Sequence, residues 1–218
     1  MEIEAKLLAP DAAVLQQLAA LPTLAGLRLA HAREQQLRTL YLDTPDGALA
    51  GAGVAARVRC ADGRWEATCK FGGSRQGAVH RRHEVTRPLA AAPAFPLRDV
   101  AATFGAEIAR HTGDAGLAPF LETAILRRSF DLVAEHRGPV AELALDTVHY
   151  RAPQAGHRSA AEYEVEAELH ANGNEDDLAL IVAELTTRFP DLTPSDLSKL
   201  ARGRAFLAQA GARHEHSP

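Results

Sequence analysis

The chain has 218 residues, the size of one large domain or two small ones. With 46% hydrophobic and 24% charged residues, it resembles an average globular protein and can bury a substantial core. Its formal net charge of −4 argues against a general nucleic-acid binder, because such binding depends on an excess of Lys and Arg that neutralises phosphates.

The sequence starts directly with charged residues, without a basic and apolar leader, and no apolar run approaches the length of a membrane helix. We therefore expect a cytoplasmic protein without a membrane partner. Cys60 and Cys69 are its only two cysteines and have no zinc-site spacing, so we expect both to be reduced and structural.

The first eight residues alternate between charged and apolar side chains, which predicts a strand with one charged and one apolar face. Its charged face consists of Glu2, Glu4 and Lys6. Further strands are predicted, in chain order, over residues 34–43, 54–60, 64–71, 80–87, 120–133, 140–150 and 162–170. Amphipathic helices are predicted over residues 11–21, 97–111, 175–188 and 195–210, and a flexible loop over 72–77.

The charged alternation recurs in most of the later strands. Its members are Arg57, Arg59, Glu66, Lys70, Arg82, Glu84, Glu142, Asp146, Glu164, Glu166 and Glu168. In an ordinary sandwich these faces would point to solvent. The amphipathic helices, however, need an apolar surface to cover, and the outside of a closed barrel would supply one.

We therefore predict an α+β fold in which eight antiparallel strands close into a barrel with a charged interior, covered by amphipathic helices. The predicted domain spans residues 1–210, followed by a short polar tail over 211–218. Burying so many ions in a dry core would cost several kcal/mol each, more than a whole domain's stability of roughly 5–15 kcal/mol. The interior must therefore be hydrated, with metal balancing the acids and an anion balancing the bases.

The carboxylates of Glu2 and Glu4 lie one strand repeat, about 7 Å, apart. Such hard oxygen donors suit Mg²⁺ or Mn²⁺. A row of cations could bind several phosphates: Lys6, Arg57, Arg59, Lys70, Arg82 and Arg127. Metal and cations together point to a polyphosphate, whose hydrolysis needs positioning and charge neutralisation rather than a protein nucleophile.

At these residues the chain resembles the CYTH domain family, the triphosphate tunnel metalloenzymes. Glu2-x-Glu4-x-Lys6 is similar to the family's ExExK signature. The further matching segments follow in the family's order: Tyr41 to Asp46, Arg57-x-Arg59, Lys70, Arg82-x-Glu84, Glu142 with Asp146, the row of Glu164, Glu166 and Glu168, and Ser198-Lys199-x-x-Arg202-Gly203. The resemblance is strongest to bacterial inorganic triphosphatases.

The resemblance implies roles for individual residues. The implied metal ligands are Glu2, Glu4, Glu166 and Glu168, assisted by Glu164 or Asp146. The implied triphosphate-binding residues are Lys6, Arg57, Arg59, Lys70, Arg82, Arg127 and Lys199. The expected catalytic group is Glu2, Glu4, Lys6 and Lys70, and it stays open which of the two lysines orients the attacking water.

The expected reaction is hydrolysis of inorganic triphosphate to pyrophosphate and phosphate. Within the same family, the alternatives are a nucleoside or thiamine triphosphatase and a class IV adenylyl cyclase. A non-catalytic polyphosphate or nucleotide-binding module is the alternative from another class. The acidic rows argue against that module, because binding an anion alone does not require so many acids.

Overall fold

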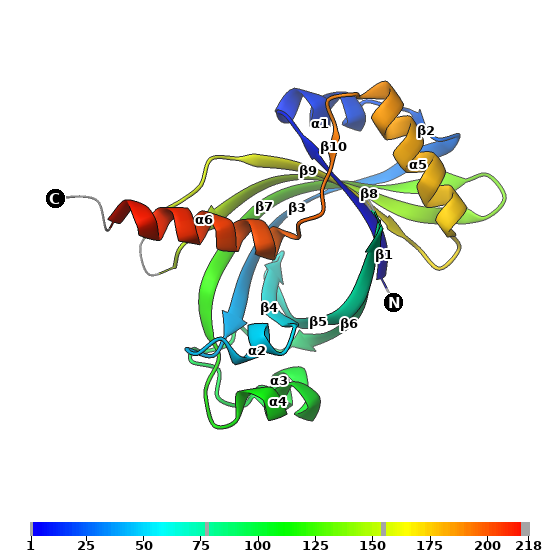
Figure 1. Ribbon diagram of the computed structural model, residues 1–218. Helices are drawn as coiled ribbons and strands as arrows, with labels where there is room; N and C mark the ends of the chain where they lie inside the picture. The colour runs from blue at the N-terminus through cyan, green and yellow to red at the C-terminus, as the bar shows by residue number, and fades with distance from the viewer. Residues whose placement is uncertain (1, 77–78, 154–155, 215–218) are drawn as a thin grey trace.

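A computed structural model describes residues 2–76, 79–153 and 156–214 (Figure 1). Its strands are β1 (Glu2–Ala9), β2 (Thr23–Leu24), β3 (Leu27–Asp43), β4 (Val54–Ala61), β5 (Arg64–Gln76), β6 (Val79–Leu89), β7 (Ala118–Ala134), β8 (Gly138–Arg151), β9 (Glu162–Leu169) and β10 (Thr193–Pro194). Its helices are α1 (Ala12–Ala19), α2 (Ala48–Gly51), α3 (Val100–Phe104), α4 (Ala106–Thr112), α5 (Glu175–Arg188) and α6 (Lys199–His214).

The strands form one strongly curled antiparallel sheet, as Figure 1 shows. Pairing follows the order β1, β6, β5, β4, β3, β7, β8, β9. Strand β1 pairs with β6 on one side and with β9 on the other, so the order of pairing returns to β1. The predicted α+β class and antiparallel sheet are confirmed. The two-residue strands β2 and β10 were not predicted, since so short a segment shows no periodicity.

The outer face of the curled sheet is apolar and covered by helices. Helices α1 and α5 bury Leu18 and Ile181 against Leu7 of β1 and Val165 of β9. A second buried cluster joins Val58 of β4 to the helices α2, α3 and α4. Because side chains alternate along a strand, the charged face turns inward, as the sequence predicts.

Helix α6 corrects the expectation that every helix covers the outer face. A third buried cluster joins Leu200, Phe206 and Leu207 of α6 to residues of β3, β7 and β8, including Tyr41 and Ile125. Tyr41 pairs in register with Arg57, and Ile125 is two residues from Arg127, so this cluster lies on the charged face. That face is apolar at one end, and α6 packs there.

Several boundaries also differ from the predicted ones. The helix predicted over 97–111 is two short helices, α3 and α4, divided at Gly105, whose φ of 98° breaks the helix. Strand β3 begins at Leu27, with a register shift beside His31, whose φ is 49°. Residues 72–76, predicted as loop, continue β5, and residue 77 lies outside the described residues.

The predicted helix 175–188 is observed as α5, which begins with a capping box between Asn174 and Asp177. The last helix starts later than predicted, at Lys199, and runs to His214, while residues 215–218 lie outside the described part. The division into a domain and a polar tail stays a prediction. Over the residues described, none of the helices combines the length and apolar character needed to cross a membrane.

Candidate active site

The inner face of the sheet encloses a cavity of about 440 Å³. Its cationic lining residues are Lys6, Arg57, Arg59, Lys70, Arg127 and Lys199. Its acidic lining residues are Glu2, Glu4, Glu66, Glu84, Glu166 and Glu168. Six of the seven predicted phosphate-binding residues therefore meet in one cavity. The seventh, Arg82, lies opposite Glu2 in the register of β6 and β1, but its side chain is outside the described part of the structure.

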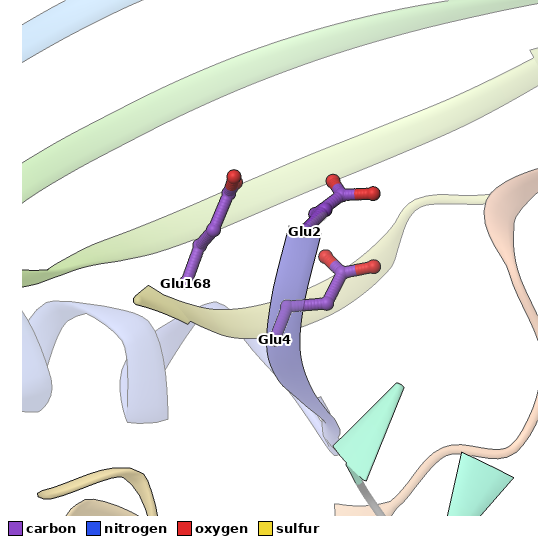
Figure 2. A group of neighbouring side chains, drawn as sticks. All are labelled: Glu2, Glu4 and Glu168. Atoms are coloured by element: carbon purple, nitrogen blue, oxygen red, sulfur yellow. The ribbon is translucent and has the colours of Figure 1, made fainter. Parts of the chain in front are cut away.

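Three carboxylates from β1 and β9 gather on one wall of the cavity, and Figure 2 shows them from one side. Each of Glu2, Glu4 and Glu168 offers an oxygen within 4.8 Å of the other two. Burial, then the charges of Glu2 and Glu4, raise the pKa of Glu168 to about 7. Among the described residues no ion pair reaches Glu168. Lys6 contacts Glu4 and Lys70 contacts Glu2, but no described cation contacts all three acids, so this oxygen donor set can hold a metal ion.

The arginines of β4 form a cationic wall. Burial, followed by the charges of Arg57 and Arg127, lowers the pKa of Arg59 to about 10. The Arg59 Nε donates to Thr39 Oγ1 at 3.1 Å. The Nε of Arg57 is buried and has no hydrogen-bond partner in the described structure. Like charges held this close, with an unsatisfied donor among them, are suited to receive an anion.

Lys70 links the two walls. Its Nζ lies 2.8 Å from both carboxylate oxygens of Glu2 and 2.7 Å from Glu84 Oε2. Burial alone would raise the pKa of Glu84, but Lys70 and Arg57 outweigh burial and lower that pKa to about 2. Glu84 was not among the predicted site residues, although the alternation Arg82-x-Glu84 was a signal for it. Glu66 also lines the cavity and was not among the predicted site residues. Its signal was the alternation Glu66-x-Thr68-x-Lys70 along β5.

The remaining predicted metal ligands form a separate set. Asp146 of β8 and Glu164 and Glu166 of β9 also offer oxygens within 4.8 Å of one another. Asp146 and Glu164 are fully buried and are not among the residues that line the cavity. The acids that the family resemblance implies as metal ligands therefore fall into two triads, and only the first has all three of its members lining the cavity.

The charges of this second triad are met by basic residues. Arg127 donates to Asp146 at 2.8 and 2.7 Å and to Glu166 at 2.6 Å. Arg202 donates to Glu164, to Glu162 at 2.9 Å and to the hydroxyl of Tyr150 at 3.1 Å. This network fixes α6 to β8 and β9. In the sequence Arg202 is visible only as part of the family-like motif.

Comparisons with known proteins agree with this architecture. The most similar solved structures include a Hippeastrum adenylyl cyclase candidate described as having a dominant triphosphatase activity, at 19% identity and a TM-score of 0.64, covering 94% of this chain and 96% of that one. A Bacillus halodurans protein named as a candidate adenylate cyclase matches at 18% identity and a TM-score of 0.58, covering 93% and 96%.

A Pyrococcus horikoshii protein matches at 15% identity and a TM-score of 0.51, covering 91% and 96%. At these identities the structures share the fold. The family model of the CYTH domain matches residues 1–203. The chain therefore belongs to the CYTH family.

Proposed function

We propose that this protein is a cytoplasmic enzyme that hydrolyses inorganic triphosphate to pyrophosphate and phosphate with Mg²⁺ or Mn²⁺. The observation that carries the proposal is that one cavity is lined by both an acidic wall and a cationic wall. The first wall is the carboxylate set of Glu2, Glu4 and Glu168. The second is the cationic wall of Arg57 and Arg59, in which Arg59 forms no ion pair among the described residues and has a pKa lowered by burial and then by the charges of Arg57 and Arg127. A polyphosphate with its metal ion complements both walls.

The first carboxylate triad would hold the metal ion, because its three acids converge, and burial followed by the charges of Glu2 and Glu4 raises the pKa of Glu168. A divalent cation, when bound there, supplies positive charge beside the phosphates and promotes ionisation of a water molecule. The protein's own task is to hold the carboxylates together, which the register of Glu4 opposite Glu168 achieves.

The cationic wall would bind and orient the triphosphate. Guanidinium groups can donate two parallel hydrogen bonds to a phosphate, and Arg57 and Arg59 present such groups from the same face of β4. Lys6 extends this wall from β1, where its Nζ lies 3.2 Å from Glu166 Oε1. Bound this way, the charge that develops on the transferred phosphoryl group is neutralised by groups already in place.

Lys70 is the lysine that we propose orients the attacking water or the phosphate next to it. It contacts Glu2 of the metal-binding triad and Glu84 on the opposite side, so it lies where the two walls meet. Glu84 would hold it in place.

Two observations support hydrolysis of a bare triphosphate over cyclisation of ATP. The Hippeastrum protein of the same fold is described as having a dominant triphosphatase activity. Among the described lining residues, Tyr41 is the one aromatic, and it is 6% exposed and packed in the cluster under α6. Among the described residues of this cavity, no exposed aromatic ring is therefore available to stack on a nucleoside base. Adenylyl cyclisation is the second candidate, supported by the naming of the Bacillus halodurans protein.

The test is a substrate panel in which inorganic triphosphate, ATP and thiamine triphosphate compete for the purified protein at saturating Mg²⁺ or Mn²⁺. The proposal expects phosphate release from inorganic triphosphate at the highest kcat/KM. A higher kcat/KM for ATP, or formation of cyclic AMP, would reverse the ranking. Tight binding of triphosphate without turnover in either metal would instead support the non-catalytic binding module.

A further inference from the structure

The two carboxylate triads differ in whether a single cation contacts all three of their acids. In the first triad, Lys6 contacts Glu4 and Lys70 contacts Glu2, but no described cation contacts all three acids. In the second triad, the ammonium group of Lys199 contacts all three acids. Lys199 Nζ lies 3.0 Å from Asp146 Oδ2 and 2.9 Å from Glu166 Oε1, and it also contacts Glu164 Oε1.

The surroundings of this ammonium are those of a bound ion. Asp146 and Glu164 have no exposed surface, and Lys199 itself is 7% exposed. Three oxygens from three carboxylates converge on one cationic atom, as they would on a small metal ion with oxygen ligands. Arg127 and Arg202 also contact these acids, but without Lys199 two guanidinium groups would face three buried carboxylates, and an uncompensated buried charge is strongly destabilising.

We propose that Lys199 is a built-in cation that fills the Asp146–Glu164–Glu166 triad in place of a metal ion. The free enzyme therefore has one resident metal site, at Glu2, Glu4 and Glu168, and the second triad serves to dock α6. The inference rests on the proposed function only in taking the first triad as that resident site. It assigns Lys199 a positioning role in addition to lining the cavity.

The docking role follows from where Lys199 lies in the chain. It is the first residue of α6, and Ser198 before it caps the helix through a hydrogen bond from the Ala201 amide at 3.2 Å. Ser198, Lys199 and Leu200 all line the cavity. Holding the ammonium in the triad therefore holds the first turn of α6 against the cavity.

The test removes the ammonium and counts metal ions. In Lys199→Met the triad keeps three acids and loses the cation common to them. We expect this variant to bind one more Mn²⁺ per chain than the wild-type protein, measured by equilibrium dialysis or by the EPR signal of free Mn²⁺. We also expect Mn²⁺ to raise its unfolding midpoint by about 5 °C more than that of the wild-type protein.

The matched control is Arg204→Met, which removes a cation from the same helix but outside the triad, where Arg204 contacts Asp43 at 3.5 Å. Its Mn²⁺ stoichiometry should equal that of the wild-type protein. A second variant, Glu164→Gln with Lys199→Met, removes one acid together with the ammonium. We expect it to fold without metal and to bind no additional Mn²⁺.

The proposal would be overturned if Lys199→Met bound the same number of Mn²⁺ ions as the wild-type protein. It would also be overturned if Lys199→Met failed to fold with or without Mn²⁺ while the double variant folded. Folding that occurs only with Mn²⁺ would support it. Because the measure is the difference between variant and wild type, it does not depend on turnover. A wild-type protein that binds no metal would contradict the proposed function but leave this difference measurable.

Discussion

Glu4 of β1 lies directly opposite Glu168 of β9 in the register of the sheet, so two acids from opposite ends of the chain stand side by side on the inner face. Like charges placed opposite each other destabilise a strand pair. Together with Glu2, they form a set whose repulsion a bound cation would relieve. The predictions below follow from this arrangement and from the cationic wall across the cavity.

Replacing Glu168 by Gln should stabilise the metal-free protein at high pH. Its pKa is about 7 in the folded protein and 4.5 ordinarily, so the folded state binds more protons between these values and stability falls as pH rises through that window. Because Glu168 is partly open to solvent, which screens its charge, Glu168→Gln without metal should exceed the wild-type protein in unfolding free energy at pH 8 by about 1 kcal/mol, and most of this difference should vanish at pH 5.

Urea unfolding in EDTA, followed through the fluorescence of the single tryptophan, Trp65, measures this difference. Saturating Mn²⁺ serves as the control and should reverse the order, because only the wild-type protein keeps its third carboxylate. A stability difference that is the same at both pH values would show that the charge of Glu168 is not its cause.

Replacing Arg59 by Ala should weaken triphosphate binding about a hundredfold, since a lost hydrogen bond to a charged group costs roughly 1.5–3 kcal/mol. Stability at neutral pH should not fall, because the substitution also removes a buried charge and relieves its repulsion from Arg57 and Arg127, the causes, in that order, that lower the pKa of Arg59. Calorimetric titration with triphosphate in EDTA measures the affinity without turnover.

The matched control is Arg38→Ala on the neighbouring strand β3. Arg38 is not among the residues that line the cavity, and its side chain is 56% exposed beside Glu122. Its removal should leave triphosphate affinity unchanged. Equal losses in both variants would mean that binding depends on the overall charge rather than on the arginine wall.

Replacing Gly203 by Ala should loosen α6. A Cβ at this position would lie 2.3 Å from Leu121 Cδ2, so either the buried Leu121 side chain or the helix must shift. We expect a loss of about 1–3 kcal/mol in stability and a rise in KM for triphosphate, because the first turn of α6 lines the cavity. Thermal unfolding and initial rates measure the two effects.

Gly51 provides the comparison, since an added Cβ there meets nothing within 4 Å. Gly51→Ala, at the end of α2, should be neutral or slightly stabilising. If Gly203→Ala behaves in the same way, the close contact of α6 with β7 does not position the helix.

The alternation of charged and apolar residues was enough to predict the inner face. It placed Glu2, Glu4, Arg57, Arg59 and Lys70 on one side of their strands, and the structure brings all five to the cavity. Periodicity identifies the face of a strand because side chains alternate regardless of tertiary context.

The sequence could not predict which charges neutralise one another. The row of Glu164, Glu166 and Glu168 looks uniform, yet Glu168 joins the triad of β1 while Glu164 and Glu166 contact Lys199. That division depends on where α6 packs, which a helical apolar stripe does not specify. Residues such as Ile125 that receive α6 alternate like any other inward-facing position, so their burial appears only in the folded chain.

The measurement that tests the account most directly is phosphate release from inorganic triphosphate by the purified protein, compared with Glu4→Ala, in Mg²⁺ or Mn²⁺ and in EDTA. The account predicts turnover that needs the metal and falls at least about a hundredfold in Glu4→Ala, while triphosphate still binds. Undiminished turnover in Glu4→Ala, or turnover that persists in EDTA, would contradict it.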